Sequence, residues 1–154
     1  MKGHRIGAKQ KIGLTVSFVG TGIVICGLNG AGKSTLGKAL AEKLDFYFID
    51  NEDYFQRKFT TEDENGNSFD DNDERSIFFV RGVMETVKKL RWVPDIIHCH
   101  GWMTALAPLY IKKAYAEDPC FRDTKVIYSS YNNSFNSPFP ASFSDKLLLE
   151  GIRK

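Results

Sequence analysis

The sequence is short of the features that mark metal-stapled, secreted or membrane-spanning proteins. Its three cysteines are neither dense nor regularly spaced and form no CxxC pair, so a zinc site has little support. We expect reduced, buried thiols in a cytoplasmic protein. Glycines interrupt the apolar stretch at residues 12–28, whereas a membrane span needs about 20 apolar residues in a row. We therefore expect neither a signal peptide nor a membrane partner.

The charge is also close to balanced. A formal net charge of +2 is too small to indicate nucleic acid as a partner. The 154 residues, with 42% hydrophobic and 26% charged side chains, are typical of one soluble domain. Residues 57–74 are acidic and polar, but their spacing does not match the twelve-residue calcium loop. We expect this stretch to be a long solvated loop.

Strand and helix patterns alternate along the chain. Short β-branched or aromatic runs predict strands at 23–26, 46–49, 95–98 and 125–128. Apolar residues at helical spacing predict helices at 33–44, 74–90, 103–115 and 145–152, with Asp73 capping the second and Pro108 kinking the third. The order predicts an α/β fold: a Rossmann-like three-layer sandwich with a mostly parallel sheet of about four strands.

A complete phosphate-binding loop pattern, Gly27-x4-Gly32-Lys33-Ser34, follows the first predicted strand and precedes the first predicted helix. In such loops the backbone N–H groups and the helix N-terminus surround phosphate oxygens. Lys33 would reach the β- and γ-phosphates, and Ser34 would hold Mg²⁺. The residues predicted to bind the phosphates of Mg-ATP are Gly27, Asn29, Gly30, Gly32, Lys33, Ser34 and Thr35.

Residues 23–53 resemble small P-loop kinases of the shikimate, gluconate and nucleoside-monophosphate kind. In those enzymes the second strand ends in an acidic residue near the acceptor hydroxyl, and Asp50 stands at that place here. The resemblance implies that Asp50 orients or deprotonates the acceptor; its placement fits a strand-end cap equally well. No arginine-rich lid follows in the sequence, so the kinase pattern is incomplete.

The run His98-Cys-His100 raises the question of a metal site. Residues two apart on a strand share a face, so the two imidazoles could converge. Cys99 would point to the other face, and the pattern offers no third ligand, so a metal site is not favoured.

Residues 46–154 resemble the N-terminal catalytic domain of bacterial glycogen and starch synthases, in the form found in Bacteroidetes-like bacteria. Five segments carry the resemblance in the correct order: Tyr47-Phe-Ile-Asp-Asn-Glu-Asp-Tyr-Phe55, Asp71-Asn-Asp-Glu-Arg-Ser-Ile-Phe-Phe79, Pro94-Asp-Ile-Ile-His-Cys-His-Gly-Trp102, Leu106-Ala-Pro-Leu-Tyr110 and Lys125-Val-Ile-Tyr128.

The resemblance implies two facing Rossmann-like domains that transfer glucose from ADP-glucose to an α-1,4-glucan with retention of configuration and without a metal. It places His100 near the glucose of the donor, at the strand end where open α/β sheets bind ligands. The alternative for His100 is an ordinary hydrogen-bonded histidine at a strand end.

The chain departs from that family in several places. Gly101 stands where many members have Asp, and Tyr128-Ser-Ser-Tyr131 stands where many have Thr-Val-His-Asn. The phosphate-binding loop replaces the family's Lys-x-Gly-Gly donor loop. Because the second domain is also missing from these 154 residues, we expect no glycosyl transfer by this chain alone.

Three hypotheses remain for the function. The first is a glycogen synthase-like segment (46–154) joined near 44–53 to a foreign P-loop unit (23–53) and an N-terminal extension (1–22), as in a chimera. The second is a small nucleotide-binding protein or kinase that phosphorylates a small-molecule hydroxyl. The third is a non-catalytic α/β protein.

Overall fold

The structure is a computed structural model, and its description covers most of the second half of the chain and parts of the first. The described residues are 14–19, 22–27, 47–49, 51–55, 57, 59, 61–130, 138–147 and 152. The predicted helix at 33–44 lies outside them, so the second helical layer of the predicted sandwich stays a prediction.

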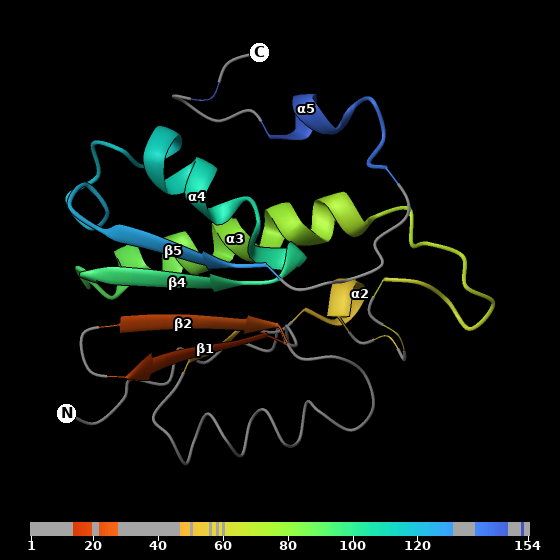
Figure 1. Ribbon diagram of the computed structural model, residues 1–154, viewed down its shortest axis with the longest axis horizontal. Helices are drawn as coiled ribbons and strands as arrows, with labels where there is room; N and C mark the ends of the chain where they lie inside the picture. Colours follow the sequence, from red (N-terminus) through yellow and green to blue (C-terminus); the bar gives the residue numbers. More distant parts are fainter. Residues whose placement is uncertain are drawn as a thin grey trace.

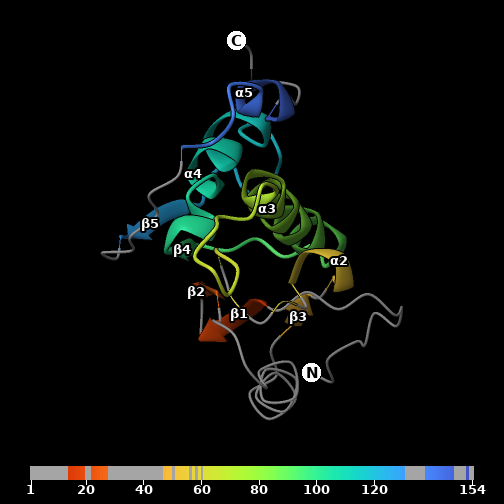
Figure 2. The ribbon, with the colours of Figure 1, turned by 90° about the vertical axis from the view of Figure 1, so that its right-hand side faces the viewer.

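The described residues form one five-stranded sheet, in the order β3-β1-β2-β4-β5 (Figures 1 and 2). Its strands are β1 Leu14–Val19, β2 Gly22–Gly27, β3 Tyr47–Ile49, β4 Ile96–His100 and β5 Lys125–Ser129. β2, β4 and β5 run parallel to one another, whereas β1 is antiparallel to both β2 and β3. The sheet is therefore mixed.

The expectation of about four mostly parallel strands is thus wrong in two respects. β1 lies inside the residues assigned to an N-terminal extension, and two of the four strand pairings are antiparallel. The physical reason is the short connection between β1 and β2, in which only residues 20 and 21 intervene. A two-residue link can join antiparallel strands, but a parallel pair needs a crossover of a dozen residues or more.

Helix α3, Asn72–Lys89, matches the predicted second helix but begins two residues earlier. Its N-cap is Asp71 rather than Asp73. Asp73 is fully buried, and its carboxylate accepts a hydrogen bond from the Lys146 ammonium, so it links α3 to the helix at residues 143–146. The apolar stripe of α3 is buried as the spacing predicts at Ile77, Val80, Val83, Met84 and Val87, whereas Leu90 is half-buried; Phe79 is buried as well.

The acidic stretch before α3 is less solvated than we expected. Arg75 is buried, and its guanidinium lies over the rings of Phe55, at 5.4 Å, and Phe69, at 5.6 Å. Burial lowers the pKa of Arg75 to about 10, which leaves it charged at neutral pH. Arg57 bonds to both carboxylate oxygens of Asp71. These contacts tie the loop to the start of α3.

The predicted helix at 103–115 is instead three short turns. A 3₁₀ turn, η1, spans Trp102–Thr104; α4 spans Ala107–Leu109; and a π-helical turn, η2, spans Tyr110–Ala114. Pro108 lies in the first turn of α4, where its missing N–H costs nothing, so it starts a segment rather than kinking one. The π turn closes with a bond from Tyr115 N–H to the Tyr110 carbonyl at 2.9 Å.

The helices α2, Glu52–Phe55, and α5, Phe143–Lys146, are both short. α2 was not predicted, and Asn51 caps it by accepting a hydrogen bond from the Tyr54 N–H at 3.0 Å. α5 begins before the predicted start at residue 145.

The core lies between the helices and one face of the parallel strands. Ile97 and Cys99 of β4 are fully buried against side chains of α3 and the turns η1 to η2. Figure 2 shows α3 and α4 stacked on the same side of β4 and β5. Because side chains alternate along a strand, His98 and His100 belong to the opposite face of the sheet.

Candidate functional site

The carboxyl ends of three parallel strands meet at one edge of the sheet. β4 lies between β2 and β5, and its register pairs Ile25 with Cys99 on one side and His100 with Ser129 on the other. Open α/β sheets bind their ligands beyond this edge, because the connecting loops leave it free. The edge is therefore the first candidate for a binding site.

His100 is the last residue of β4 and lies at this edge. Its ring is half-buried and stacks on that of His98, with ring centroids 3.9 Å apart and planes inclined by 39°. Burial lowers the pKa of His100, and the charge that His98 can carry lowers it further. A neutral imidazole at pH 7 has one donor and one acceptor nitrogen, which suits hydrogen bonding to hydroxyl groups.

Gly101 turns the chain away from the sheet directly after His100. Its φ of 70° and ψ of −178° lie in a region that is essentially restricted to glycine. Its N–H donates to the Ser129 carbonyl at 3.0 Å, and its own carbonyl accepts from the hydroxyls of Tyr128, at 3.0 Å, and Thr104, at 3.1 Å. The backbone beyond His100 is thus held by β5 and by η1.

The phosphate-binding pattern begins at the same edge. β2 ends at Gly27, the first residue of the pattern, and β2 lies parallel to β4, so Gly27 lies at the same edge as the end of β4. The remaining predicted phosphate ligands, Asn29, Gly30, Gly32, Lys33, Ser34 and Thr35, and the predicted acceptor residue Asp50 lie outside the described residues. Of the predicted phosphate ligands, Gly27 is thus the one that lies within the described residues.

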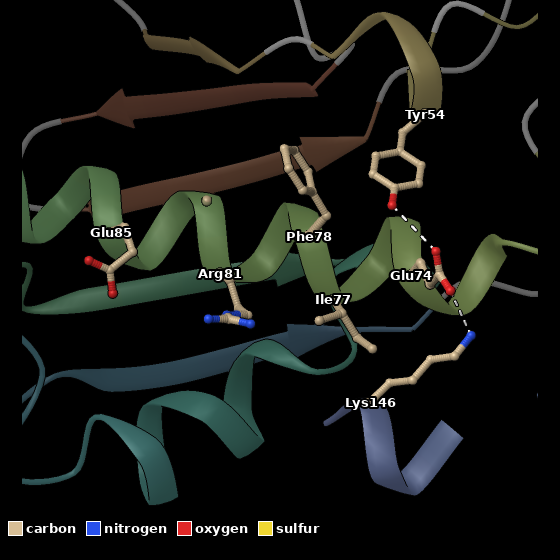
Figure 3. Close-up of a pocket in the computed structure, with 8 residues that line it drawn as sticks. Tyr54, Glu74, Ile77, Phe78, Arg81, Glu85 and Lys146 are labelled. Atoms are coloured by element: carbon tan, nitrogen blue, oxygen red, sulfur yellow. Dashed lines mark hydrogen bonds and ion pairs between the residues drawn. The ribbon is translucent and has the colours of Figure 1, made fainter. Parts of the chain in front are cut away.

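A separate pocket of about 500 Å³ lies on the outer side of α3, between α2 and α5 (Figure 3). Three of its polar side chains contact one another: Lys146 Nζ lies 2.9 Å from Glu74 Oε1, and the Tyr54 hydroxyl donates to Glu74 Oε2 at 3.4 Å. Hydrogen bonds to Asp73 and Glu74 raise the pKa of Lys146. None of the residues predicted to bind ligands lines this pocket, so we favour the sheet edge as the site.

Sequence reasoning missed Ser129, Tyr128 and Thr104 as parts of the site. The strand was predicted to end at 128, yet β5 continues to Ser129, whose hydroxyl lies 2.7 Å from His98 Nε2. No local signal identifies these residues, because each acts through a neighbour on another element.

Two further properties concern the described part of the chain. It contains no group of three or more His, Cys, Asp or Glu side chains that could hold a metal ion. Among its helices, none has the length and apolar character needed to cross a membrane.

Comparison with known proteins gives one consistent family. The family model for the starch synthase catalytic domain matches residues 9–153. The glycogen synthase of Chlorobium limicola is 40% identical over 113 residues, and that of Pelodictyon phaeoclathratiforme is 39% identical; each match covers 73% of this chain and 23% of the relative. Glycogen synthase 2 of Geobacter sulfurreducens is 34% identical over 115 residues, or 74% of this chain and 24% of the relative. The chain thus spans about a quarter of the length of these relatives.

The conformation of Gly101 leads to a stability prediction. Replacing Gly101 by Asp or by Ala should each destabilise the protein by about 1–3 kcal/mol, because both add a Cβ to a backbone that favours glycine. Urea unfolding measures this. Unchanged midpoints in both variants would show that the turn relaxes without cost.

The environment of His100 leads to a pH prediction. Its imidazole should titrate below the ordinary value of 6.5, because burial and His98 both disfavour the charged form. As the pH falls, the unfolded chain therefore protonates this histidine at a higher pH than the folded chain does. The folding stability should fall as the pH drops from 6.5 towards the folded-state pKa. Proton NMR of the ring across pH 4–8 measures the midpoint, and a value at or above 6.5 contradicts the prediction.

Proposed function

The chain belongs to the family of starch synthase catalytic domains, and from this premise we propose that it forms the donor-side part of a glycogen synthase-type glycosyltransferase. The reaction proposed for the whole enzyme transfers glucose from ADP-glucose to the non-reducing end of an α-1,4-glucan in the cytoplasm. The bond between glucose C1 and the diphosphate breaks, a bond from C1 to the acceptor hydroxyl forms, and ADP leaves with the hydroxyl proton released.

The observation that carries the proposal is the position of His100. It ends the middle one of three parallel strands, at the edge where such sheets bind ligands, and Gly101 then turns the backbone away. Its pKa is lowered, so it is neutral at pH 7 and can bond to a sugar hydroxyl without attracting a counterion. We propose that it contacts the glucosyl group of the donor.

The remaining donor contacts are proposed to come from elsewhere in a complete synthase. A nucleoside diphosphate needs several positive charges or N–H donors around its phosphates. The described part of this edge supplies imidazoles, hydroxyls and backbone groups. We therefore propose that this chain binds ADP-glucose weakly by itself and contributes to the sugar end of the site.

The proposal predicts that His100→Ala weakens ADP-glucose binding by about two- to tenfold, the effect of one lost hydrogen bond. Isothermal titration calorimetry of the full chain measures it. His4→Ala, a histidine of the leading segment of the sequence, is the matched control and should bind like wild type. Equal affinity in His100→Ala removes the role proposed for His100.

A second candidate function, binding of Mg-ATP, is favoured by the complete loop pattern. The strand that such a loop requires is present, because β2 ends at Gly27 and lies parallel to β4. In this alternative Lys33 and Ser34 engage the phosphates and Mg²⁺, and Asp50 orients a small-molecule hydroxyl for phosphoryl transfer. The glycosyltransferase remains the first candidate, because the matching family covers nearly the whole chain.

Thermal unfolding distinguishes the two candidates. If the loop binds, Mg-ATP at a hundred times its Kd should stabilise the chain by about 2.7 kcal/mol and raise Tm by roughly 5–11 °C. Lys33→Ala should abolish the shift, whereas Lys43→Ala, outside the loop pattern, should keep it. A shift with ADP-glucose and none with Mg-ATP would reject the kinase alternative.

A further inference from the structure

The rings of His98 and His100 are closer than their places on the strand require. Residues two apart on a strand are separated by about 6.6 Å along its axis. The ring centroids of these two histidines are only 3.9 Å apart. One or both side chains must therefore lean along the strand towards the other.

Ser129 shows in which direction His98 leans. The register places Ile127 beside His98 and Ser129 beside His100. The hydrogen bond nevertheless joins His98 Nε2 to Ser129 Oγ, at 2.7 Å. The His98 ring thus reaches diagonally towards the carboxyl end of β5, and this reach brings it onto the His100 ring.

The side chains of Ser129, His98 and His100 contact one another in that order, and we call these three side chains the stack. We propose that His98 and Ser129 are positioning residues for His100: Ser129 holds the His98 ring, and the His98 ring holds the His100 imidazole in one orientation at the sheet edge. The benefit of this positioning for binding of the sugar donor rests on the proposed function.

Contacts of this kind restrict the orientation of an imidazole ring. The torsion that rotates the ring has broad, roughly two-fold preferences, so the side chain alone does not select one ring orientation. Immobilising a side chain on binding typically lowers affinity by roughly two- to tenfold, and a ring that is already held avoids this loss. The Ser129 hydroxyl can donate or accept, so it bonds to either neutral tautomer of His98.

The electrostatics agree with the geometry. His98 contributes to the lowered pKa of His100, as expected for two imidazoles in contact that disfavour a second positive charge. Contact with His98 therefore both restricts the His100 ring and favours its neutral form.

Imidazole NMR on the full chain tests the positioning without any ligand, and only three histidines contribute signals. In Ser129→Ala, the His100 ring resonances should shift and broaden, because the ring samples more than one orientation. Ser129→Thr, which keeps the hydroxyl, should restore them. Ser130→Ala, at the neighbouring exposed serine, is the matched control and should resemble wild type. Unchanged His100 resonances in Ser129→Ala would overturn the proposal.

A second variant and a binding measurement complete the test. His98→Phe keeps a ring but loses Nε2, so it should disturb His100 as Ser129→Ala does. Both variants should bind ADP-glucose about two- to tenfold more weakly than wild type. If wild type does not bind ADP-glucose, the proposed function fails, while the ring spectra still decide the positioning. Altered spectra with unchanged donor affinity would overturn the role of this stack in binding.

Discussion

The two-residue alternation of β4 is the constraint on which the rest of the structure depends. Ile97 and Cys99 are fully buried against α3 and the turns that follow η1, so β4 cannot rotate or slip by one residue without exposing them. The same packing directs His98 and His100 to the other face. Burial also raises the pKa of Cys99 to about 12, so this thiol stays protonated and acts as an apolar core group.

The candidate site follows from this constraint and from the neighbours of β4. β2 on one side brings the start of the glycine-rich pattern to the sheet edge, and β5 on the other brings Ser129. Gly101 lies between them and is bonded to β5 and η1 at once. The two motifs that point to different enzyme families in the sequence thus reach the same edge: the glycine-rich pattern begins where β2 ends, and the run His98–His100 ends β4. Both proposed functions therefore place their ligand at this edge.

Sequence reasoning succeeded where the pattern is local. The apolar stripe of α3 is buried at the predicted spacing, and β4 and β5 lie within two residues of their predicted positions. It failed where contacts between residues far apart in the sequence determine the local structure. The helix at 103–115 is divided into three turns, and Asp73, predicted as an exposed cap, is buried beside Lys146, which lies 73 residues away. A carboxylate in an acidic run carries no local sign of such a partner.

The sequence by itself determined the family, the periodicity of the elements and the presence of a complete phosphate-binding pattern, because these depend on residue types and their spacing along one chain. Only the tertiary structure decided that β1 joins the sheet in the antiparallel sense. It also decided that the Ser129 hydroxyl bonds to His98, although the strand register pairs Ser129 with His100. Both depend on which strands become neighbours and how far their side chains reach across, and spacing along the sequence does not contain that information.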